Sequence, residues 1–439
     1  MMKKKIALLT ASAVLIAASV LGCRQNTGEP DPNFVSVQPP SSGSEPSPQR
    51  VEGIEGIKVI EGESTLSQTS SLSGSSESET VGGLPKLIPW QRYLFGGGGG
   101  EDYTVADVED LKSANPWTGD AELKTLPVYQ NVYVSPEDIP ESVRMTEGLT
   151  GRRASQEEME AAARAVAQEL NVEVSSVELF PSEELIQRFK TQKGEVPKEY
   201  QYVNSVTLNC GGGEISIEAD TELNIHISFE PGLVLPEEYA LKPDASYEEQ
   251  IKRGEYLIEQ YGKLLHMEKP VLNIDRKRSF EGMSFCSVYE GAGDLTQQLV
   301  NYSMNTADFT FFSEGELAGI RLYRRDISEK IGDYPIITAE QAQEKLAAGG
   351  YIGGAAAQFP GEEHIVHTEL VYPTDQVLWM PYYRFYAEIG FDQLSYPPET
   401  EAEKISRDGR PLKAYAAFYV PAIEDGYLER MPDINGRFN

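Results

Sequence analysis

The chain has 439 residues, of which 69 are acidic and 38 basic, so its formal net charge at pH 7 is −31. So strong a negative charge excludes nucleic acid and anionic lipid as the surfaces that the body of the protein binds. The length is sufficient for two or three folded domains.

The first segment has the pattern of a secretory signal peptide. Lys3, Lys4 and Lys5 form a positively charged start, and an uncharged, mostly apolar run follows from Ile6 to Leu21. That run is shorter than the ~20 residues that a membrane-spanning helix needs. An ordinary signal peptide ends in a small-x-small cleavage site such as Ala-x-Ala. The sequence matches that site poorly, because no alanine occurs between Ala18 and Ala106.

The apolar run ends in Val20-Leu21-Gly22-Cys23, which resembles the lipobox of bacterial lipoproteins. The resemblance implies that residues 1–22 are removed, that the Cys23 sulfur carries diacylglycerol, and that the protein is anchored to the extracytoplasmic face of the cell membrane. Two acyl chains suffice for stable anchoring. The alternative is a chance cysteine beside a plain signal peptide.

Residues 23–100 are expected to form a flexible linker. Ser, Pro, Gly and Glu dominate in QPPSSGSEPSPQR and STLSQTSSLSGSSESET, and aromatic residues are few. Such a composition buries too little apolar surface to offset chain entropy. The run of five glycines at 96–100 lacks the strand, helix and Lys-Ser/Thr context of a phosphate-binding loop.

Three helices are predicted from capping boxes, which begin at Ser155, Ser246 and Thr338. A fourth, shorter helix is predicted after Pro181-Ser182. The first two carry apolar residues on one face, as a helix packed against a core does. These stripes are Met159, Ala163, Val166 and Leu170 in the first helix, and Tyr247, Ile251, Gly254, Ile258, Tyr261 and Leu265 in the second.

Alternating, strand-like runs follow each capped helix. They are residues 201–209, 213–220 and 223–230, then 284–290, 307–313 and 317–325, and finally 364–372, 379–389 and 414–423. We therefore predict an α+β fold of tandem modules, each an antiparallel sheet with helices on one face. The expected organisation is one or two modules in residues 101–325 and a C-terminal module in residues 326–439.

The run GDYPIITAEQAQEKLAAGGY (332–351) with ELVYPTDQVLWMPYYRFYAEI (369–389) resembles PepSY-like modules of exported bacterial proteins. It also resembles the YycI/YycH type of extracytoplasmic regulator of sensor kinases. The resemblance covers about a quarter of the chain. It implies a regulatory, non-catalytic role with no catalytic residues, although those regulators are usually tethered by a transmembrane helix.

The sequence offers no catalytic or metal motif. His226, His266, His364 and His367 are the histidines, and only the last two lie close together, in a strand-like segment where they would point to opposite faces. We expect no metal and no cofactor. Cys210 and Cys286 could form a disulfide in an exported protein, or be two buried thiols.

One strand-like segment suggests a binding face. In PYYRFYAEIG, alternation places Tyr382, Arg384, Tyr386 and Glu388 together, and Tyr and Arg are enriched at interfaces. The alternative is that the tyrosines pack under a neighbouring element. The prediction is a non-enzymatic, lipid-anchored protein that binds another envelope protein or a sensor domain. A solute-binding lipoprotein of a transporter and an enzyme acting on wall polymer or peptide remain the alternatives.

Overall fold

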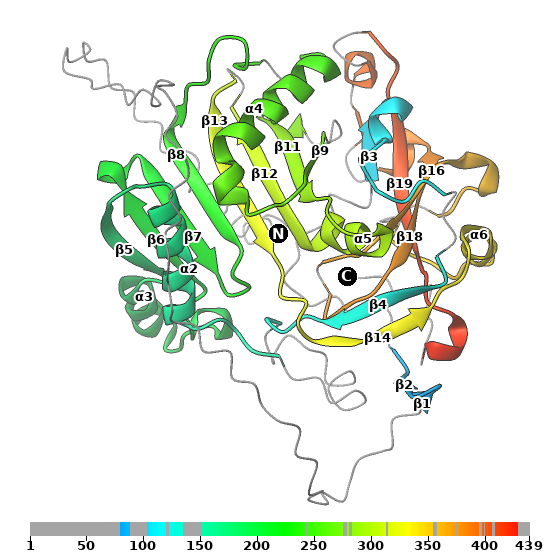
Figure 1. Ribbon diagram of the computed structural model, residues 1–439, viewed down its shortest axis with the longest axis horizontal. Helices are drawn as coiled ribbons and strands as arrows, with labels where there is room; N and C mark the ends of the chain where they lie inside the picture. Colours follow the sequence, from blue (N-terminus) through cyan, green and yellow to red (C-terminus); the bar gives the residue numbers. More distant parts are fainter. Residues whose placement is uncertain are drawn as a thin grey trace, which may run out of the picture. The chain divides into compact units, whose positions relative to one another are not determined.

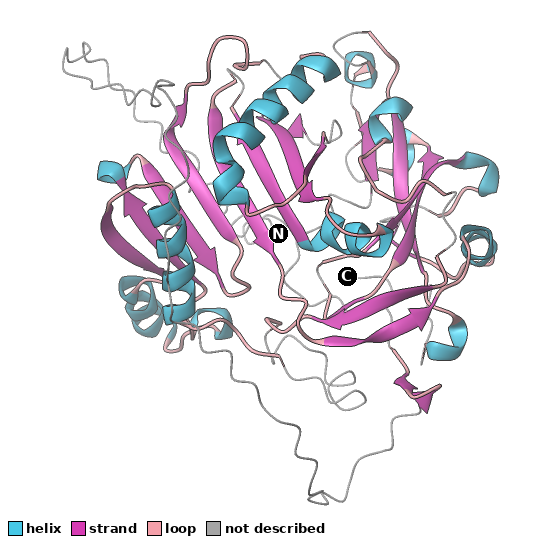
Figure 2. Ribbon diagram, in the orientation of Figure 1, coloured by secondary structure: helices cyan, strands magenta, loops and turns pink. Residues whose placement is uncertain are grey.

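The computed structural model describes residues 80–87, 103–119, 123–134, 151–241, 245–274, 279–280, 283–312, 315–353, 358–374, 376–394, 397–398, 400–405 and 409–428. The fold is α+β, as predicted, with helices packed on antiparallel sheets (Figure 2). Cys23 and nearly all of the predicted linker lie outside the described residues. Within those residues, no helix combines the length and the apolar character that crossing a bilayer requires.

The three helices predicted from capping boxes are all present. They are α2 (Gln156–Glu169), α4 (Tyr247–Leu265) and α6 (Ala339–Ala347), and in each the N-cap and N3 residues bond reciprocally. Helix α3 (Glu183–Lys193) follows its N-cap Ser182, also as predicted. Helix α5 (Leu295–Met304) begins at Asp294 without a capping box, so the sequence carried no such signal for it.

The largest sheet has nine strands in the antiparallel order β10-β11-β12-β13-β8-β7-β6-β5, with β9 paired to β11. The strands are β5 (Val174–Phe180), β6 (Ser205–Cys210), β7 (Ile215–Asp220), β8 (Ile225–Leu233), β9 (Pro270–Asn273), β10 (Ser279–Phe280), β11 (Met283–Glu290), β12 (Asn305–Phe311) and β13 (Leu317–Arg324). Strands β5, β9 and β10 were not among the predicted strands; in β5, serines and a glutamate interrupt the apolar pattern.

Two helix-then-strand modules share this sheet. Helix α2 precedes β5 to β8, helix α4 precedes β9 to β13, and the modules join where β8 pairs with β13, the last strand of each (Figure 1). Helices α2 and α4 lie on the same face of the sheet (Figure 1). The two modules therefore have one continuous core.

That core is mainly aliphatic. Met159, Ala163 and Val166 of α2 and Leu257 and Leu264 of α4 are buried against the inward side chains of the strands. Gly254 of α4 comes so close to β9 that a Cβ atom there would lie 2.5 Å from Leu272 Cδ2, which explains why a glycine interrupts this helix's apolar stripe.

The C-terminal part contains a five-stranded sheet, β15-β19-β18-β16 with β3 paired to β19, and a three-stranded sheet, β14-β4-β17. Their strands are β3 (Tyr103–Ala106), β4 (Thr125–Gln130), β14 (Lys330–Pro335), β15 (Ile352–Gly353), β16 (Ile365–Val371), β17 (Leu378–Trp379), β18 (Tyr382–Ile389) and β19 (Lys413–Pro421); a separate hairpin pairs β1 (Thr80–Val81) with β2 (Leu84–Pro85).

Strands β3 and β4 precede α2 in the chain but pair with C-terminal strands. The described residues of 103–134 therefore fold with those of 326–428, whereas the predicted organisation grouped 103–134 with 151–325. Short 3₁₀ helices connect several strands: η1 (Val108–Leu111), η2 (Lys198–Tyr200), η3 (Gly211–Gly213), η4 (Glu362–His364), η5 (Phe391–Gln393), η6 (Glu401–Lys404) and η7 (Asp425–Tyr427).

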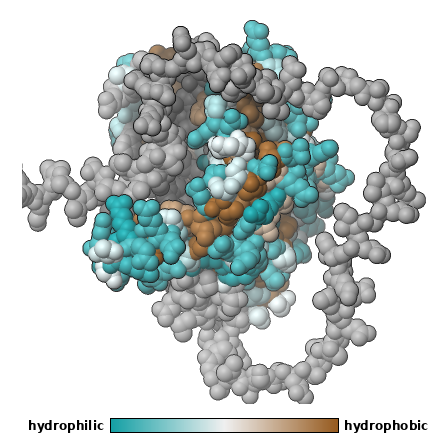
Figure 3. All heavy atoms as spheres, turned by 90° about the vertical axis from the view of Figure 1, so that its left-hand side faces the viewer, coloured by the Kyte–Doolittle hydropathy of each residue, from teal (hydrophilic) through white to brown (hydrophobic). Residues whose placement is uncertain are grey.

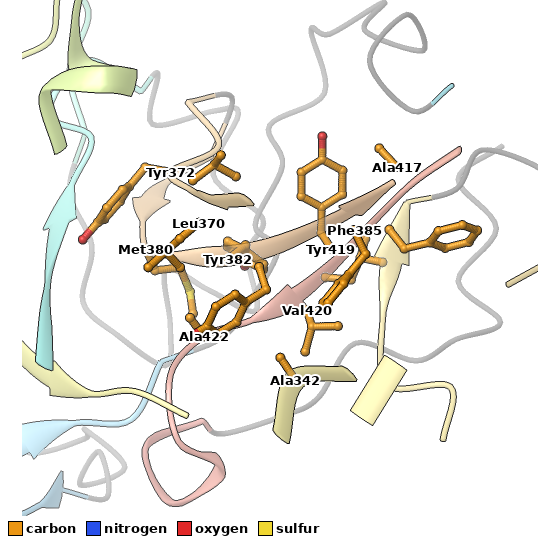
Figure 4. Close-up of a cluster of buried hydrophobic side chains, with 14 of the residues drawn as sticks. Ala342, Leu370, Tyr372, Met380, Tyr382, Phe385, Ala417, Tyr419, Val420 and Ala422 are labelled. Carbon is orange, nitrogen blue, oxygen red and sulfur yellow. The ribbon is translucent and has the colours of Figure 1, made fainter. Parts of the chain in front are cut away.

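The C-terminal core is rich in aromatic residues. Tyr382, Phe385 and Tyr419 gather with Met380 and Val420 in one buried cluster (Figure 4). Buried tyrosine hydroxyls find backbone partners: the Tyr383 hydroxyl donates to the carbonyl of Ile337 at 2.9 Å. Helix α5 joins this core through Leu299, Val300 and Met304, and it also packs on β11 and β12 of the large sheet.

Candidate functional site

The structure does not place the predicted binding face of β18 at the surface. The side chains of Tyr382 and Tyr386 are buried, at 0% and 5% exposure. Strand β18 lies between β16 and β19, and side chains cover both of its faces. The two tyrosines are packed, as the alternative interpretation expected, and the prediction of an exposed binding face is wrong. Alternation marks an open face only in a strand with one side in water. Glu388, at the rim, pairs with Lys413 at 2.6 Å.

Arg384 is instead half of a buried ion pair. Its Nε donates to Glu369 Oε2 on β16 at 2.9 Å, and its Nη2 donates to the same oxygen. The Glu369 side chain is 1% exposed and that of Arg384 16%. Burial alone would lower the pKa of Arg384, but the charge of Glu369 raises that pKa well above its usual value.

Two more donors reach the other oxygen of the same carboxylate. Ser113 Oγ donates to Glu369 Oε1 at 2.5 Å, and His367 Nε2 lies 3.1 Å from that atom. The His367 ring also stacks on Tyr386, with 6.1 Å between centroids. We call these four residues, Ser113, His367, Glu369 and Arg384, the Glu369 cluster.

Hydrogen bonds extend from the Glu369 cluster to the nine-stranded sheet. The hydroxyl of Tyr302 on α5 donates to Ser113 Oγ at 3.0 Å, and Asn273 Nδ2 on β9 donates to the Tyr302 hydroxyl at 3.5 Å. Asn273 Oδ1 in turn accepts the N–H of Ala114 at 2.9 Å. The chain of bonds runs from one sheet through a helix and a loop to the other.

The Glu369 cluster has the properties of a structural ion pair that holds neighbouring elements in place. Its carboxylate accepts hydrogen bonds on both oxygens, and its arginine is committed to that carboxylate. A buried ion pair of this kind contributes little net stability, but it is costly to break from one side. The cluster therefore holds the relative positions of β16, β18 and the loop at Ser113.

The nine-stranded sheet has two faces of opposite character. In the pairing register, one row of directly opposed residues is apolar and lies under α2 and α4: Cys286, Phe309, Ile320, Ile227, Ile217, Leu208 and Val177. The adjacent row lies on the other face and is polar: Ser287, Asp308, Arg321, His226, Glu218, Thr207 and Glu178. We call this second row the polar ladder.

Helix α5 covers the polar ladder at one end, where Tyr302 meets Tyr289 edge to face, with 5.2 Å between centroids. Ser287 Oγ donates to Asp308 Oδ1 at 2.6 Å there, and Asp308 is buried. Toward β5 the row opens: Arg321 and Glu178 are exposed, and the residues between them are half-buried. Arg321 makes no ion pair with any residue that the structure describes.

The charges of the polar ladder affect one another. Burial and the neighbouring positive charge of Arg321 lower the pKa of His226 to about 4, so this imidazole is neutral at pH 7. Burial raises the pKa of Glu218, and a hydrogen bond from Ser205 and the charge of Arg321 partly oppose that shift. The open part of the ladder thus carries one exposed cation beside a neutral histidine.

Cys210 and Cys286 are both free and buried, so they form no disulfide in this structure. Cys210 lies on β6 and Cys286 on β11, and the sheet order places four strands between them. At ~4.8 Å per strand, the separation is about 24 Å, far beyond the ~7 Å limit for Cα atoms of a disulfide. Burial raises the pKa of Cys286 to about 12, so this thiol stays protonated.

The histidines are distributed over separate elements. His226 is on β8, His266 caps α4 and lies 2.6 Å from Glu169 of α2, and His364 and His367 are on η4 and β16. Among the described residues, no three His, Cys, Asp or Glu side chains gather in a way that could hold a metal ion.

The polar ladder is the part of the site that sequence reasoning missed. Each strand shows its own polar alternation, for example His226 and Ser228 in IHISFE. The pairing of β8 with β13, which brings His226 opposite Arg321, joins strands about 95 positions apart. No local pattern encodes that pairing.

No protein-family model matches this chain, and no curated protein matches it either. One solved structure that is similar is an uncharacterized protein from Eubacterium rectale, with a TM-score of 0.33 and 10% sequence identity. The match covers 69% of this chain and 84% of that one.

Proposed function

We propose that this protein is a lipid-anchored, extracytoplasmic and non-enzymatic lipoprotein that binds another envelope protein or a sensor domain. The Val20-Leu21-Gly22-Cys23 sequence supports the anchor. The resemblance to PepSY-like and YycI/YycH-type modules supports a regulatory binding role.

The observation that carries the proposal is the open part of the polar ladder. A sheet that packs helices on one face can present the other to a partner, and this face extends across strands β13 to β5. Arg321 on β13 is exposed where this face begins, beside the part that α5 covers, and arginine is a frequent hot spot at interfaces. Hydrogen bonds from Ser113 through Tyr302 to Asn273 connect the Glu369 cluster to the large sheet.

The anchor is tested by metabolic labelling with a fatty acid. Only a cysteine can form the thioether, so Cys23→Ala should abolish the label that the wild-type protein carries. Equal label in both proteins would remove the anchor from the proposal.

The binding face is tested by site-specific photo-crosslinking in membranes. A photoreactive residue in place of Arg321 should form a discrete crosslinked product. The matched control is the same residue in place of Lys252, which is exposed on α4, on the opposite face of the sheet. Products from both positions, or from neither, would contradict the polar face as the partner surface.

A further inference from the structure

Strand β5 forms one end of the nine-stranded sheet. It pairs with β6 on one side, and in the described part of the chain no strand pairs with its other side. Such an edge presents a row of backbone N–H and C=O groups, which proteins commonly protect with Lys, Pro or a short strand. Residues Val174–Phe180 include neither Lys nor Pro, although Pro181 follows directly. A β-bulge interrupts the pairing with β6 between Val174 and Ser176, so the regular part of the edge is residues 176–180.

The side chains of β5 are accessible on both faces of the sheet. Ser175, Ser176, Val177 and Glu178 are all exposed, and Val177 and Phe180 are 38% and 47% exposed. Figure 3 faces the side of the molecule on which β5 lies in Figure 1, and hydrophobic residues run across this side among hydrophilic ones. An exposed strand edge is a template for pairing with another strand.

The two faces of β5 differ in chemistry. Val177 lies opposite Leu208 on the apolar face, and Glu178 lies opposite Thr207 as the last residue of the polar ladder. Asn209 Nδ2 donates to Glu178 Oε1 at 2.7 Å and to Ser176 Oγ at 3.0 Å, so these side chains are held in place. Glu178 is exposed and makes no ion pair with any described residue.

We propose that β5 binds an extended segment of the partner protein as an additional strand, and that the side chains of this segment alternate between basic and aliphatic. The backbone of β5 would supply the hydrogen bonds, as in other cases of strand addition. A basic side chain would lie beside Glu178, and an aliphatic one beside Val177, because cross-strand neighbours share a face. This inference rests on the proposed function. It specifies the segment of the partner that pairs with β5, where the polar ladder ends.

The probe is a capped, fluorescent eight-residue peptide in which Lys and Val alternate, and the measurement is its anisotropy with the full chain. Saturable binding is expected, and Glu178→Lys should weaken it at least tenfold. Methylating every second amide nitrogen of the peptide should abolish binding, because it removes the backbone donors. A peptide with Glu in place of Lys should not bind.

The matched control variant is Glu183→Lys, which makes the same charge change at an exposed position of α3, outside the strand. It should leave the affinity for the Lys peptide unchanged. Equal binding of the Lys and Glu peptides, equal effects of the two variants, or no binding to the wild type would each overturn the inference. A dimer seen by sedimentation and dissociated by Val177→Lys would assign the edge to a second copy, and would overturn it too.

Failure here is distinguishable from failure of the proposed function. If the peptide does not bind but the crosslink from position 321 persists, the partner uses the sheet face and not the β5 edge. If the crosslink is absent, the proposed function fails whatever the peptide does.

Discussion

Strand β18 and strand β8 show the same alternation in the sequence and have opposite environments in the fold. In β8, Ile225, Ile227 and Phe229 are buried, while His226 and Ser228 reach the open polar face. In β18 both sets of side chains are covered, because other parts of the chain pack on both faces of its sheet. Alternation therefore reports which residues share a face, and only packing decides whether that face is wet.

The two regions also treat charge differently. On β18, Arg384 is compensated by Glu369, whose two oxygens accept from three side chains at 2.5–3.1 Å. On the polar ladder, Arg321 meets solvent, and its charge acts on His226 and Glu218 through space. Substitutions should therefore reduce stability in the first region and leave it nearly unchanged in the second.

The largest effect is expected for Glu369→Ala. It leaves Arg384 largely buried without its carboxylate, and removing one partner of a buried ion pair costs about 3–5 kcal/mol of unfolding free energy. Urea denaturation measures it. The double variant Glu369→Ala with Arg384→Met is the control and should recover much of the loss; a double variant no more stable than the single would contradict this account of the pair.

A somewhat smaller loss is expected for Tyr382→Ala. The side chain is fully buried beside Met380 and Ala422 (Figure 4), and truncating a large buried aromatic residue costs about 3 kcal/mol. The melting temperature should fall by several degrees. If the variant is as stable as the wild type, Tyr382 is exposed and not packed in the core, and the predicted binding face on β18 is again supported.

The acid side of the stability curve should depend on His226. Its pKa is about 4 in the folded protein and ~6.5 when unfolded, so the unfolded state binds the proton first as the pH falls. Stability is therefore lost between pH 6.5 and 4, by roughly 2 kcal/mol after allowance for partial exposure.

His226→Gln should remove this contribution. Glu218 and Asp220, whose pKa values burial raises, act in the opposite direction, because the folded state takes up their protons first. The difference between wild type and variant, measured by denaturation at several pH values, isolates the histidine. Parallel curves for the two proteins over this range would show that the imidazole titrates normally.

The smallest effect is expected for Arg321→Ala. An exposed side chain without an ion pair among the described residues contributes little, and such surface changes stay within about 0.5 kcal/mol. The measurement is the melting temperature of this variant, compared with that of Tyr382→Ala under the same conditions. A loss near that of Tyr382→Ala would mean that the polar face is packed in the same way as β18.

The sequence by itself determined the local elements. Capping boxes located the starts of α2, α4 and α6, since the bonds that form them lie within four residues. Alternating apolar residues located most strands of the nine-stranded and five-stranded sheets and indicated the α+β class. Helix α5 and strand β5 lacked these local signals, and neither was predicted.

Tertiary structure decided the rest, because it depends on contacts between residues far apart in the chain. The pairing of β8 with β13 assembles the polar ladder, and the five strand steps from β6 to β11 keep Cys210 and Cys286 apart. Ser113 contacts Glu369, 256 positions away, and Glu369 in turn pairs with Arg384. Arg384, predicted as a binding residue, is therefore part of a buried ion pair. Burial is a property of the assembled layers, and a strand's own residues cannot specify what will cover them.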